Sequence, residues 1–192
     1  MERKQYLAGV TFGATTASYD LEKAVDNLCS LEGVSEEALR AVLPSFIGEQ
    51  DQVAPLFSAK SVDGVRVYEL ARKRYKAGLP VEDLGVLQAS RINIYGLELV
   101  SFSVSTGNGP SAAAESMASS RINVAELPAG LPQAEILVDC SKGTYIRALA
   151  RALGEALGSG AFLHSLRRTR NGGFSVEDAF SMNEISKIFE IA

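Results

Sequence analysis

Residues 139–150 are the part of the chain whose residue types are best suited to chemistry. The segment reads as the end of a strand, a glycine turn and the start of a helix, with Tyr145 and Arg147 in the first helical turn. A cation at Arg147 opposes the positive end of the helix dipole. A residue so unfavourable to its own helix predicts that the guanidinium binds a specific anion; an ordinary surface arginine is the alternative.

Other reactive residues carry no comparable signal. The glycine-rich segment 107–111 lacks the lysine and the strand-to-helix frame of a phosphate-binding loop, so we interpret it as a surface loop. His164 is the only histidine, and in a predicted strand its default role is structural. Together with one histidine, Cys29 and Cys140 are too few for a zinc site. Two thiols so far apart in sequence indicate a reducing compartment.

The charge of the chain is distributed in blocks. The net charge of -4 argues by itself against a nucleic-acid partner, but residues 60–76 and 142–170 are basic. The cationic residues of the first block are Lys60, Arg66, Arg72, Lys73, Arg74 and Lys76. Local patches decide where a polyanion binds, so both blocks are candidate contacts for nucleic acid. Solvated helix faces are the alternative.

Hydrophobic periodicity predicts the elements that must position these residues. Residues 5–13 alternate, with Tyr6 and Val10 on one face, as in a half-buried strand. A turn-rich stretch, 14–20, follows. Four apolar residues at helical spacing predict a helix from its N-cap, Ser35, to Phe46.

Further elements follow from the same criteria. They are strands at 90–104, 121–126, 134–140 and 161–170, and helices at about 67–76, 144–157 and 183–190. Thr144 is the expected cap of the second helix, and the polar segment 105–120 reads as a long surface loop. Because strands and helices do not alternate regularly, the sequence predicts one α+β domain: a mixed, mainly antiparallel sheet flanked by helices.

Four ordered blocks resemble the TruB family of pseudouridine synthases. C-S-K-G-T-Y-I-R at residues 140–147 is similar to the family signature, and residues 4–20 resemble its K-x-Y … G-x-x-T-x-T-x-D strand and loop. Residues 52–72 resemble Q-x-P-P-x-[FY]-S-A-x-K-x-x-G … Y-x-x-A-R, with Ala54 where proline is usual. Residues 166–174 resemble L-R-R-T-x-x-G-x-[FY]. The resemblance therefore covers most of the chain.

The resemblance implies an enzyme that isomerises a uridine in the T-loop of tRNA to pseudouridine, with no metal and no organic cofactor. The base must leave the loop stack to be reached. The family pattern implies that Tyr6 stacks on the extruded uracil, that Tyr145 packs behind it and assists proton transfer, and that Leu166 closes the apolar side. Arg147 would pair with the catalytic aspartate, and Asp20 would join that charge network.

The basic block at 60–76 lies within the part that resembles the family's thumb, about residues 54–90. The thumb clamps the T-arm of the tRNA, so its cations are expected to contact phosphates in a sequence-independent, salt-sensitive manner. The residues expected to bind RNA are Lys60, Arg66, Arg72, Lys73, Arg74 and, at the strand–helix turn, Lys142. Oligomeric state stays open at this stage.

The family's nucleophilic aspartate lies upstream, in a G-x-L-D-x-x-A-T-G element that these 192 residues do not contain. We therefore expect a catalytic domain that is incomplete at its N-terminus and inactive alone, since the reaction needs that carboxylate within reach. The missing part would leave an exposed sheet edge and apolar surface. A C-terminal RNA-binding module of the PUA type is not expected. The alternative is a non-catalytic RNA-binding or RNA-folding paralogue.

The sequence indicates a cytoplasmic protein. No stretch approaches the ~20 apolar residues of a membrane span. The first residues, M-E-R-K-Q, lack the apolar core of a signal peptide.

Overall fold

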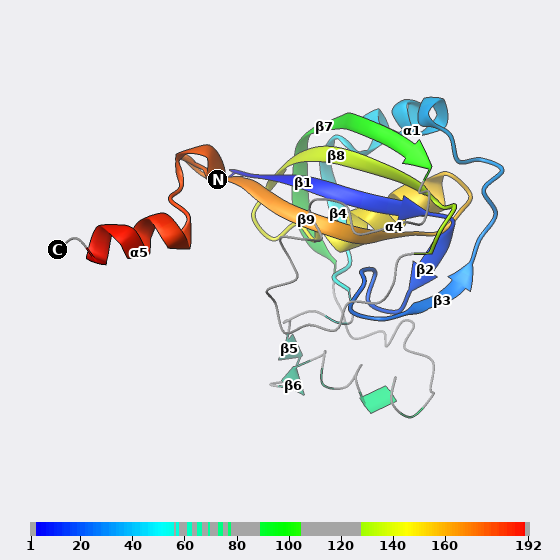
Figure 1. Cartoon of the computed structure of the whole chain (residues 1–192). Helices are drawn as coiled ribbons and strands as arrows, with labels where there is room; N and C mark the ends of the chain where they lie inside the picture. The colour runs from blue at the N-terminus through cyan, green and yellow to red at the C-terminus, as the bar shows by residue number, and fades with distance from the viewer. Residues whose placement is uncertain are drawn as a thin grey trace.

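The fold is built on a six-stranded sheet in the order β10-β9-β1-β8-β7-β4, in which every neighbouring pair is antiparallel. The computed structural model describes residues 3–55, 57, 61–62, 65–66, 69, 73–74, 77, 89–104 and 128–190. The strands of the main sheet are β1 (Arg3–Phe12), β4 (Gly48–Gln52), β7 (Ser90–Val104), β8 (Pro132–Ser141), β9 (Ala161–Asn171) and β10 (Phe174–Ser175). The predicted α+β class is confirmed (Figure 1).

Smaller elements surround this sheet. Two hairpins are formed by β2 (Ala14–Thr16) with β3 (Val25–Leu28) and by β5 (Ser61–Val62) with β6 (Val65–Arg66). The helices are α1 (Glu36–Val42), η1 (Leu43–Phe46), α4 (Ile146–Ala156), η2 (Val176–Asp178) and α5 (Met182–Glu190). Within the described ranges, no helix is both long enough and apolar enough to cross a membrane.

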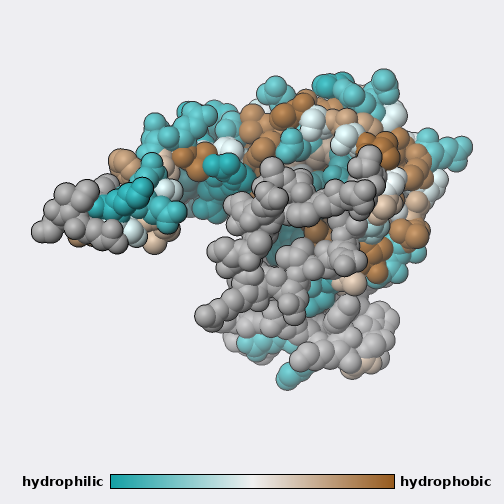
Figure 2. All heavy atoms as spheres, in the orientation of Figure 1, coloured by the Kyte–Doolittle hydropathy of each residue, from teal (hydrophilic) through white to brown (hydrophobic). Residues whose placement is uncertain are grey.

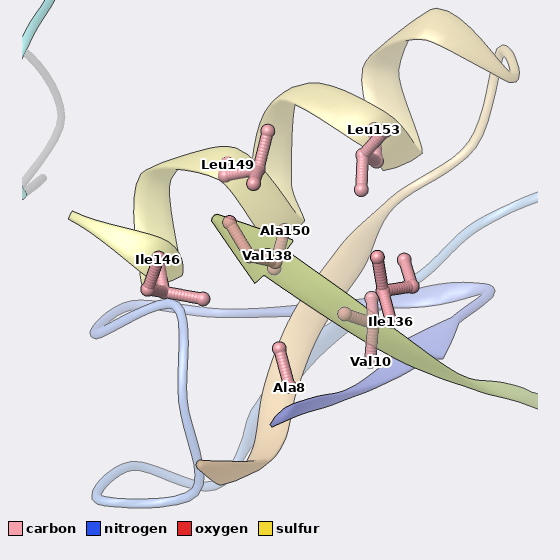
Figure 3. Close-up of a pocket in the computed structure, with 8 residues that line it drawn as sticks. All are labelled: Ala8, Val10, Ile136, Val138, Ile146, Leu149, Ala150 and Leu153. Atoms are coloured by element: carbon pink, nitrogen blue, oxygen red, sulfur yellow. The ribbon is translucent and has the colours of Figure 1, made fainter. Parts of the chain in front are cut away.

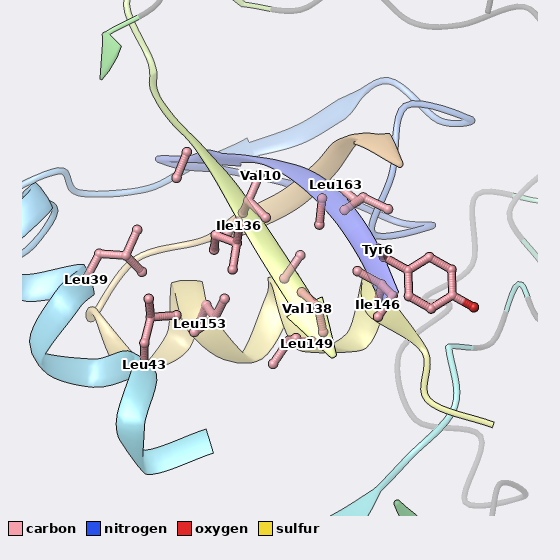
Figure 4. Close-up of a cluster of buried hydrophobic side chains, with 14 of the residues drawn as sticks. Tyr6, Val10, Leu39, Leu43, Ile136, Val138, Ile146, Leu149, Leu153 and Leu163 are labelled. Atoms are coloured by element: carbon pink, nitrogen blue, oxygen red, sulfur yellow. The ribbon is translucent and has the colours of Figure 1, made fainter. Parts of the chain in front are cut away.

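Strand β1 occupies the centre of the sheet, between β8 and β9. Its alternating residues Tyr6, Ala8, Val10 and Phe12 are buried, as the sequence predicts. They pack with Ile136 and Val138 of β8, and with helix α4, in one hydrophobic cluster (Figure 4). Burying apolar area against a helix is the main source of stability for such a layer.

The other face of β1 is also covered near its end, which differs from the half-buried strand that we expected. Gly9 and Thr11 are both buried. The register with β9 shifts between Gly9 and Val10, leaving His164 as the extra residue of a β-bulge. The His164 ring lies over this face, with its Nδ1 2.9 Å from Thr11 Oγ1.

Helix α4 carries the apolar stripe that its spacing predicts. Ile146, Leu149, Ala150 and Leu153 are buried, and they meet the sheet so closely that no water fits between them (Figure 3). This interface is therefore hydrophobic core and not a binding cavity.

The expected N-cap of this helix is wrong. Tyr145 is the capping residue and makes no side-chain capping bond. The Thr144 hydroxyl instead donates to Ser141 O at 2.9 Å, so it closes the turn that precedes the helix.

Helix α1 begins as predicted. The Ser35 hydroxyl accepts a hydrogen bond from Ala38 N at 3.1 Å, which satisfies one of the free donors of the first turn. Leu39 of α1 and Leu43 of η1 are buried in the same cluster as α4.

Several expected boundaries differ or fall outside the described residues. The stretch 14–20 holds strand β2 as well as a turn, and β4 was not predicted. Strand β4 has no apolar residue in its sequence G-E-Q-D-Q, because it forms the outer edge of the sheet. The strand predicted at 121–126 and the loop at 105–120 lie outside the described residues, as does most of the helix at 67–76.

The two ends of the sheet are unlike each other. Strand β4 pairs only with Ser90–Ile94 of β7, so the rest of the outer edge of β7 has no partner among the described strands. At the other end, the predicted closing helix, α5, extends away from the sheet (Figure 1). Hydrophilic side chains cover much of the visible face of this end (Figure 2). Phe174, Phe180, Met182 and Phe189 are nevertheless exposed there.

Gly154 of α4 gives a test of how closely helix and sheet approach. A Cβ added there would lie 2.5 Å from the backbone N of Ala161 and 2.6 Å from the carbonyl carbon of Gly160. Alanine normally stabilises an exposed helix by about 1 kcal/mol relative to glycine. Gly154→Ala should instead lower the free energy of unfolding by about 1–3 kcal/mol, because backbone must move. Gly96→Ala is the matched control, since a Cβ there meets nothing within 4 Å. Chemical denaturation measures both, and a stabilised Gly154→Ala protein would contradict the packing.

His164 gives a test of pH dependence. Burial lowers the pKa of its imidazole from 6.5 to about 4. The unfolded chain therefore takes up this proton at a higher pH than the folded chain. The free energy of unfolding should fall as the pH decreases from about 6.5 to about 4, by roughly 2–3 kcal/mol from this group.

The contribution of His164 can be separated from that of the carboxyl groups. A His164→Asn protein should lack this part of the pH dependence. Since the chain has one histidine, a single imidazole signal in the NMR spectrum reports its titration directly. A midpoint near 6.5 would show that the ring is solvated.

Candidate functional site

An arginine–aspartate pair lies where helix α4 meets the turn after β2. Arg147 Nη1 is 2.9 Å from Asp20 Oδ2 and also donates to Ser18 O at 3.3 Å. Arg147 Nη2 donates to Phe57 O at 2.9 Å. Both charged side chains are about three-quarters buried, with relative exposures of 21% and 25%. The structure therefore places an anion beside Arg147, and that anion is Asp20.

The Asp20 carboxylate is oriented by its own turn. Its Oδ1 accepts hydrogen bonds from Ser18 Oγ at 2.6 Å and from Glu22 N at 3.0 Å. Its backbone carbonyl accepts from the hydroxyls of Thr16 and Ser18. These bonds direct Oδ2 alone at Arg147, so the carboxylate is held as a fixed counter-ion.

Tyr145 is positioned through its backbone. The side chain of Gln52, at the end of β4, accepts from Tyr145 N at 2.8 Å and donates to Tyr145 O at 3.1 Å. A helix N-terminus has unpaired N–H groups. Here the side chain of Gln52, from strand β4, satisfies one of them. The Tyr145 side chain is half-buried.

Tyr6 and Leu166 lie on neighbouring strands. Ala8 pairs with Leu166 and Tyr6 pairs with Arg168, so all four side chains share the face of the sheet that α4 covers. Tyr6 is only 9% exposed, whereas Leu166 is 40% exposed. Figure 4 shows the Tyr6 ring at the end of the core, beyond Ile146. An aromatic ring and an apolar side chain therefore lie on the sheet face that is covered by α4, the helix that carries Arg147.

The sequence did not identify Arg168 as a partner of Tyr6. Its Nε lies 3.3 Å from the Tyr6 hydroxyl, and its guanidinium carbon is 5.4 Å from the ring centroid. Gln52 and Ser18, which hold Tyr145 and Asp20, were missed as well. All three lie inside or beside the family-like blocks, which was the only signal that could have pointed to them.

The predicted RNA-binding cations lie only partly within the described residues. Lys142 and Lys73 are exposed, and Arg74 is half-buried. Lys60 and Arg72 lie outside the described residues, and of Arg66 only the backbone in β6 is described. The structure brings none of these cations into contact with the Arg147–Asp20 pair among the contacts that it describes.

Cys140 does not add a nucleophile to the site. Burial raises the pKa of its thiol, so the thiolate that would react is disfavoured at neutral pH. Among the described residues, the carboxylate that pairs with Arg147 is that of Asp20.

Comparison with known families identifies the class of protein. Residues 1–146 match the model of the TruB family pseudouridylate synthase N-terminal domain. Residues 147–192 match the model of the tRNA pseudouridylate synthase B C-terminal domain. The chain belongs to the TruB family of pseudouridine synthases, as its four sequence blocks indicated.

Relatives in two bacteria carry the name tRNA pseudouridine synthase B. The chain is 41% identical over 179 residues to the protein of Phocaeicola vulgatus, covering 93% of this chain and 61% of that protein. It is 39% identical over 189 residues to the protein of Parabacteroides distasonis, covering 98% of this chain and 66% of that protein. The chain thus spans less than two thirds of the length of these curated relatives.

Solved structures share the fold. A chain of a Cbf5-Nop10-Gar1 complex matches with a TM-score of 0.55 and 20% identity, covering 98% of this chain and 36% of that one. A chain of an H/ACA RNP bound to a substrate RNA containing 2'-deoxyuridine matches with a TM-score of 0.51 and 18% identity, over 98% of this chain and 35% of that one. At this level of identity the likeness establishes the architecture.

Gln52 gives a test of how Tyr145 and α4 are held. Gln52→Ala removes two hydrogen bonds to the helix N-cap and should lower the free energy of unfolding by about 1–2 kcal/mol. Gln50→Ala is the matched control, because Gln50 is half-buried on the same strand and donates one local bond, to Phe46 O. Hydrogen exchange at the first turn of α4 should quicken in the Gln52 variant alone. Equal exchange in both variants would mean that Gln52 does not hold the helix start.

Proposed function

We propose that the chain supplies the base pocket and RNA clamp of an enzyme that converts a T-loop uridine of tRNA to pseudouridine. The Arg147–Asp20 pair, together with Tyr6, Tyr145 and Leu166, carries this proposal. Family membership and the names of the bacterial relatives support the reaction class and the RNA. Because tRNA is the substrate, we place the protein in the cytoplasm.

The reaction moves a bond within one nucleotide. The glycosidic bond from N1 of uracil to C1′ breaks, and a new bond from C5 to C1′ forms. C5 loses its proton and N1 gains one, so nothing is oxidised and no atom is lost overall. Such an isomerisation needs an extruded base, a carboxylate near C1′ and a group that moves the C5 proton.

The chain has residues suited to two of these needs: binding the extruded base and moving the C5 proton. Tyr6 offers an aromatic face to the uracil, and such stacking contributes about 1–3 kcal/mol per base. Leu166 supplies the apolar side, and Tyr145 a phenol near the base for proton transfer. Lys60, Arg66, Arg72, Lys73 and Arg74, with Lys142, are proposed phosphate contacts that hold the T-arm.

Arg147 is proposed to hold the reacting carboxylate. A guanidinium has five N–H donors, and the described bonds of Arg147 use Nη1 and Nη2. Within the described residues, Nε has no acceptor in this arrangement. A second carboxylate could approach that side while Asp20 keeps its place. The family's G-x-L-D-x-x-A-T-G element is the proposed source of that carboxylate.

Release of tritium from C5 of a labelled T-arm RNA measures the reaction directly. The 192-residue chain should bind this RNA and release no tritium, because its sequence contains no G-x-L-D-x-x-A-T-G element to supply the second carboxylate. Joined behind a family segment that carries G-x-L-D-x-x-A-T-G, it should become active. Arg147→Ala in this longer protein should reduce the rate by at least about 100-fold, while RNA binding largely survives.

Arg40→Ala in the longer protein is the control, since Arg40 forms an exposed pair with Glu36 on α1. An active Arg147→Ala protein would refute the assigned role of this arginine. RNA binding without tritium release from the longer protein would instead favour a non-catalytic RNA-binding role.

A further inference from the structure

Tyr19, the residue before Asp20, has a backbone conformation that tyrosine rarely adopts. Its φ is 60°, and among the described residues no other non-glycine residue has a positive φ. The left-handed conformation crowds Cβ against the following carbonyl. Strain of this kind persists only where surrounding contacts enforce it, so the contacts of Tyr19 must hold the turn.

The backbone of Tyr19 is held on both sides. Its N–H donates to Thr16 O at 3.0 Å, and its carbonyl accepts from Leu163 N of β9 at 2.9 Å. Asp20 then forms a parallel bridge with Leu163. These contacts therefore attach the turn to strand β9 of the main sheet.

The side chain of Tyr19 is held by helix α4. Arg151 Nη1 donates to the Tyr19 hydroxyl at 2.6 Å, and the guanidinium carbon lies 5.0 Å from the ring centroid. Glu155, one turn further along the helix, accepts from Arg151 Nε at 2.6 Å. The guanidinium is thus fixed between a carboxylate and a phenol.

Arg147 and Arg151 act on adjacent parts of the same turn. They are four residues apart in α4, so they lie on one face of the helix. Arg147 binds Ser18 O and the Asp20 carboxylate, while Arg151 binds the side chain of Tyr19 between them. We propose that Arg151 is a positioning residue that keeps Tyr19 in the left-handed conformation and thereby keeps Asp20 against Arg147. Its meaning for catalysis rests on the proposed function, but the positioning itself does not.

The proposal predicts a specific form of rescue. Without Arg151, Tyr19 loses its side-chain anchor, and the turn should relax toward ordinary backbone angles, moving Asp20 away from Arg147. Glycine adopts a positive φ without steric cost. Tyr19→Gly should therefore restore the turn in an Arg151→Ala protein, although it adds no contact. The steric cost for a residue with a Cβ corresponds to about a tenfold change in the population of the ordered turn.

NMR of the RNA-free 192-residue chain can test this. The guanidinium N–H signals of Arg147 should be separate and slow to exchange while Nη1 and Nη2 are bound, and Arg147→Lys identifies them. In Arg151→Ala these signals should broaden and exchange about tenfold faster. In Arg151→Ala/Tyr19→Gly they should return. Arg40→Ala is the matched control, because Arg40 and Glu36 form a similar exposed pair four residues apart, at 2.7 Å.

The Arg147 N–H signals of the variants decide whether the proposal stands. Unchanged Arg147 signals in Arg151→Ala, or a failure of Tyr19→Gly to restore them, would overturn the proposal. If Arg151→Ala does not fold, Tyr19→Phe removes the hydroxyl acceptor alone and should still quicken exchange several-fold; no change would overturn it. The measurement needs neither RNA nor turnover, so a longer protein that proves inactive would count against the proposed function and leave this result standing.

Discussion

A largely buried guanidinium that must find acceptors is the constraint on which the rest of the structure depends. Removing a cation from water costs free energy unless it is paired and hydrogen-bonded. Arg147 meets this need with oxygens from segments far apart in the sequence: the turn at Ser18 and Asp20, and the carbonyl of Phe57. The sheet, the β2–β3 hairpin and the segment after β4 must all be in place before this cation is satisfied.

The start of α4 is accordingly held from several directions. The helix is fixed against the sheet by apolar packing, and its first turn is fixed by Gln52. Tyr145 and Arg147 therefore have little freedom relative to β1, which carries Tyr6. A rigid frame of this kind suits a site that must hold a base and a carboxylate at fixed positions.

The sequence predicted those features whose cause is local. Alternation identified β1, helical spacing identified α4, and an arginine opposed to a helix dipole implied an anionic neighbour. It failed where tertiary contacts decide. Strand β4 has no apolar residue, so no hydrophobic pattern predicts it. Thr144 has the residue type of a helix cap, but its hydroxyl donates to Ser141 O instead. Family resemblance placed Asp20 in the charge network of Arg147, but only the structure shows that Asp20 is its direct partner, because no spacing rule connects residues so distant in sequence. The catalytic roles remain proposals for the same reason.

The central place of β1 has a consequence for how the protein is made. Ala8 pairs with Ile136 on one side and with Leu166 on the other, so both partners of β1 are synthesised long after β1 itself. At 5–20 residues per second a ribosome needs roughly ten seconds or more to supply both partners. During that time β1 lacks both of its neighbouring strands, β8 and β9. The nascent chain is then most exposed to aggregation, and chaperones that shield extended apolar segments would act on it at this stage.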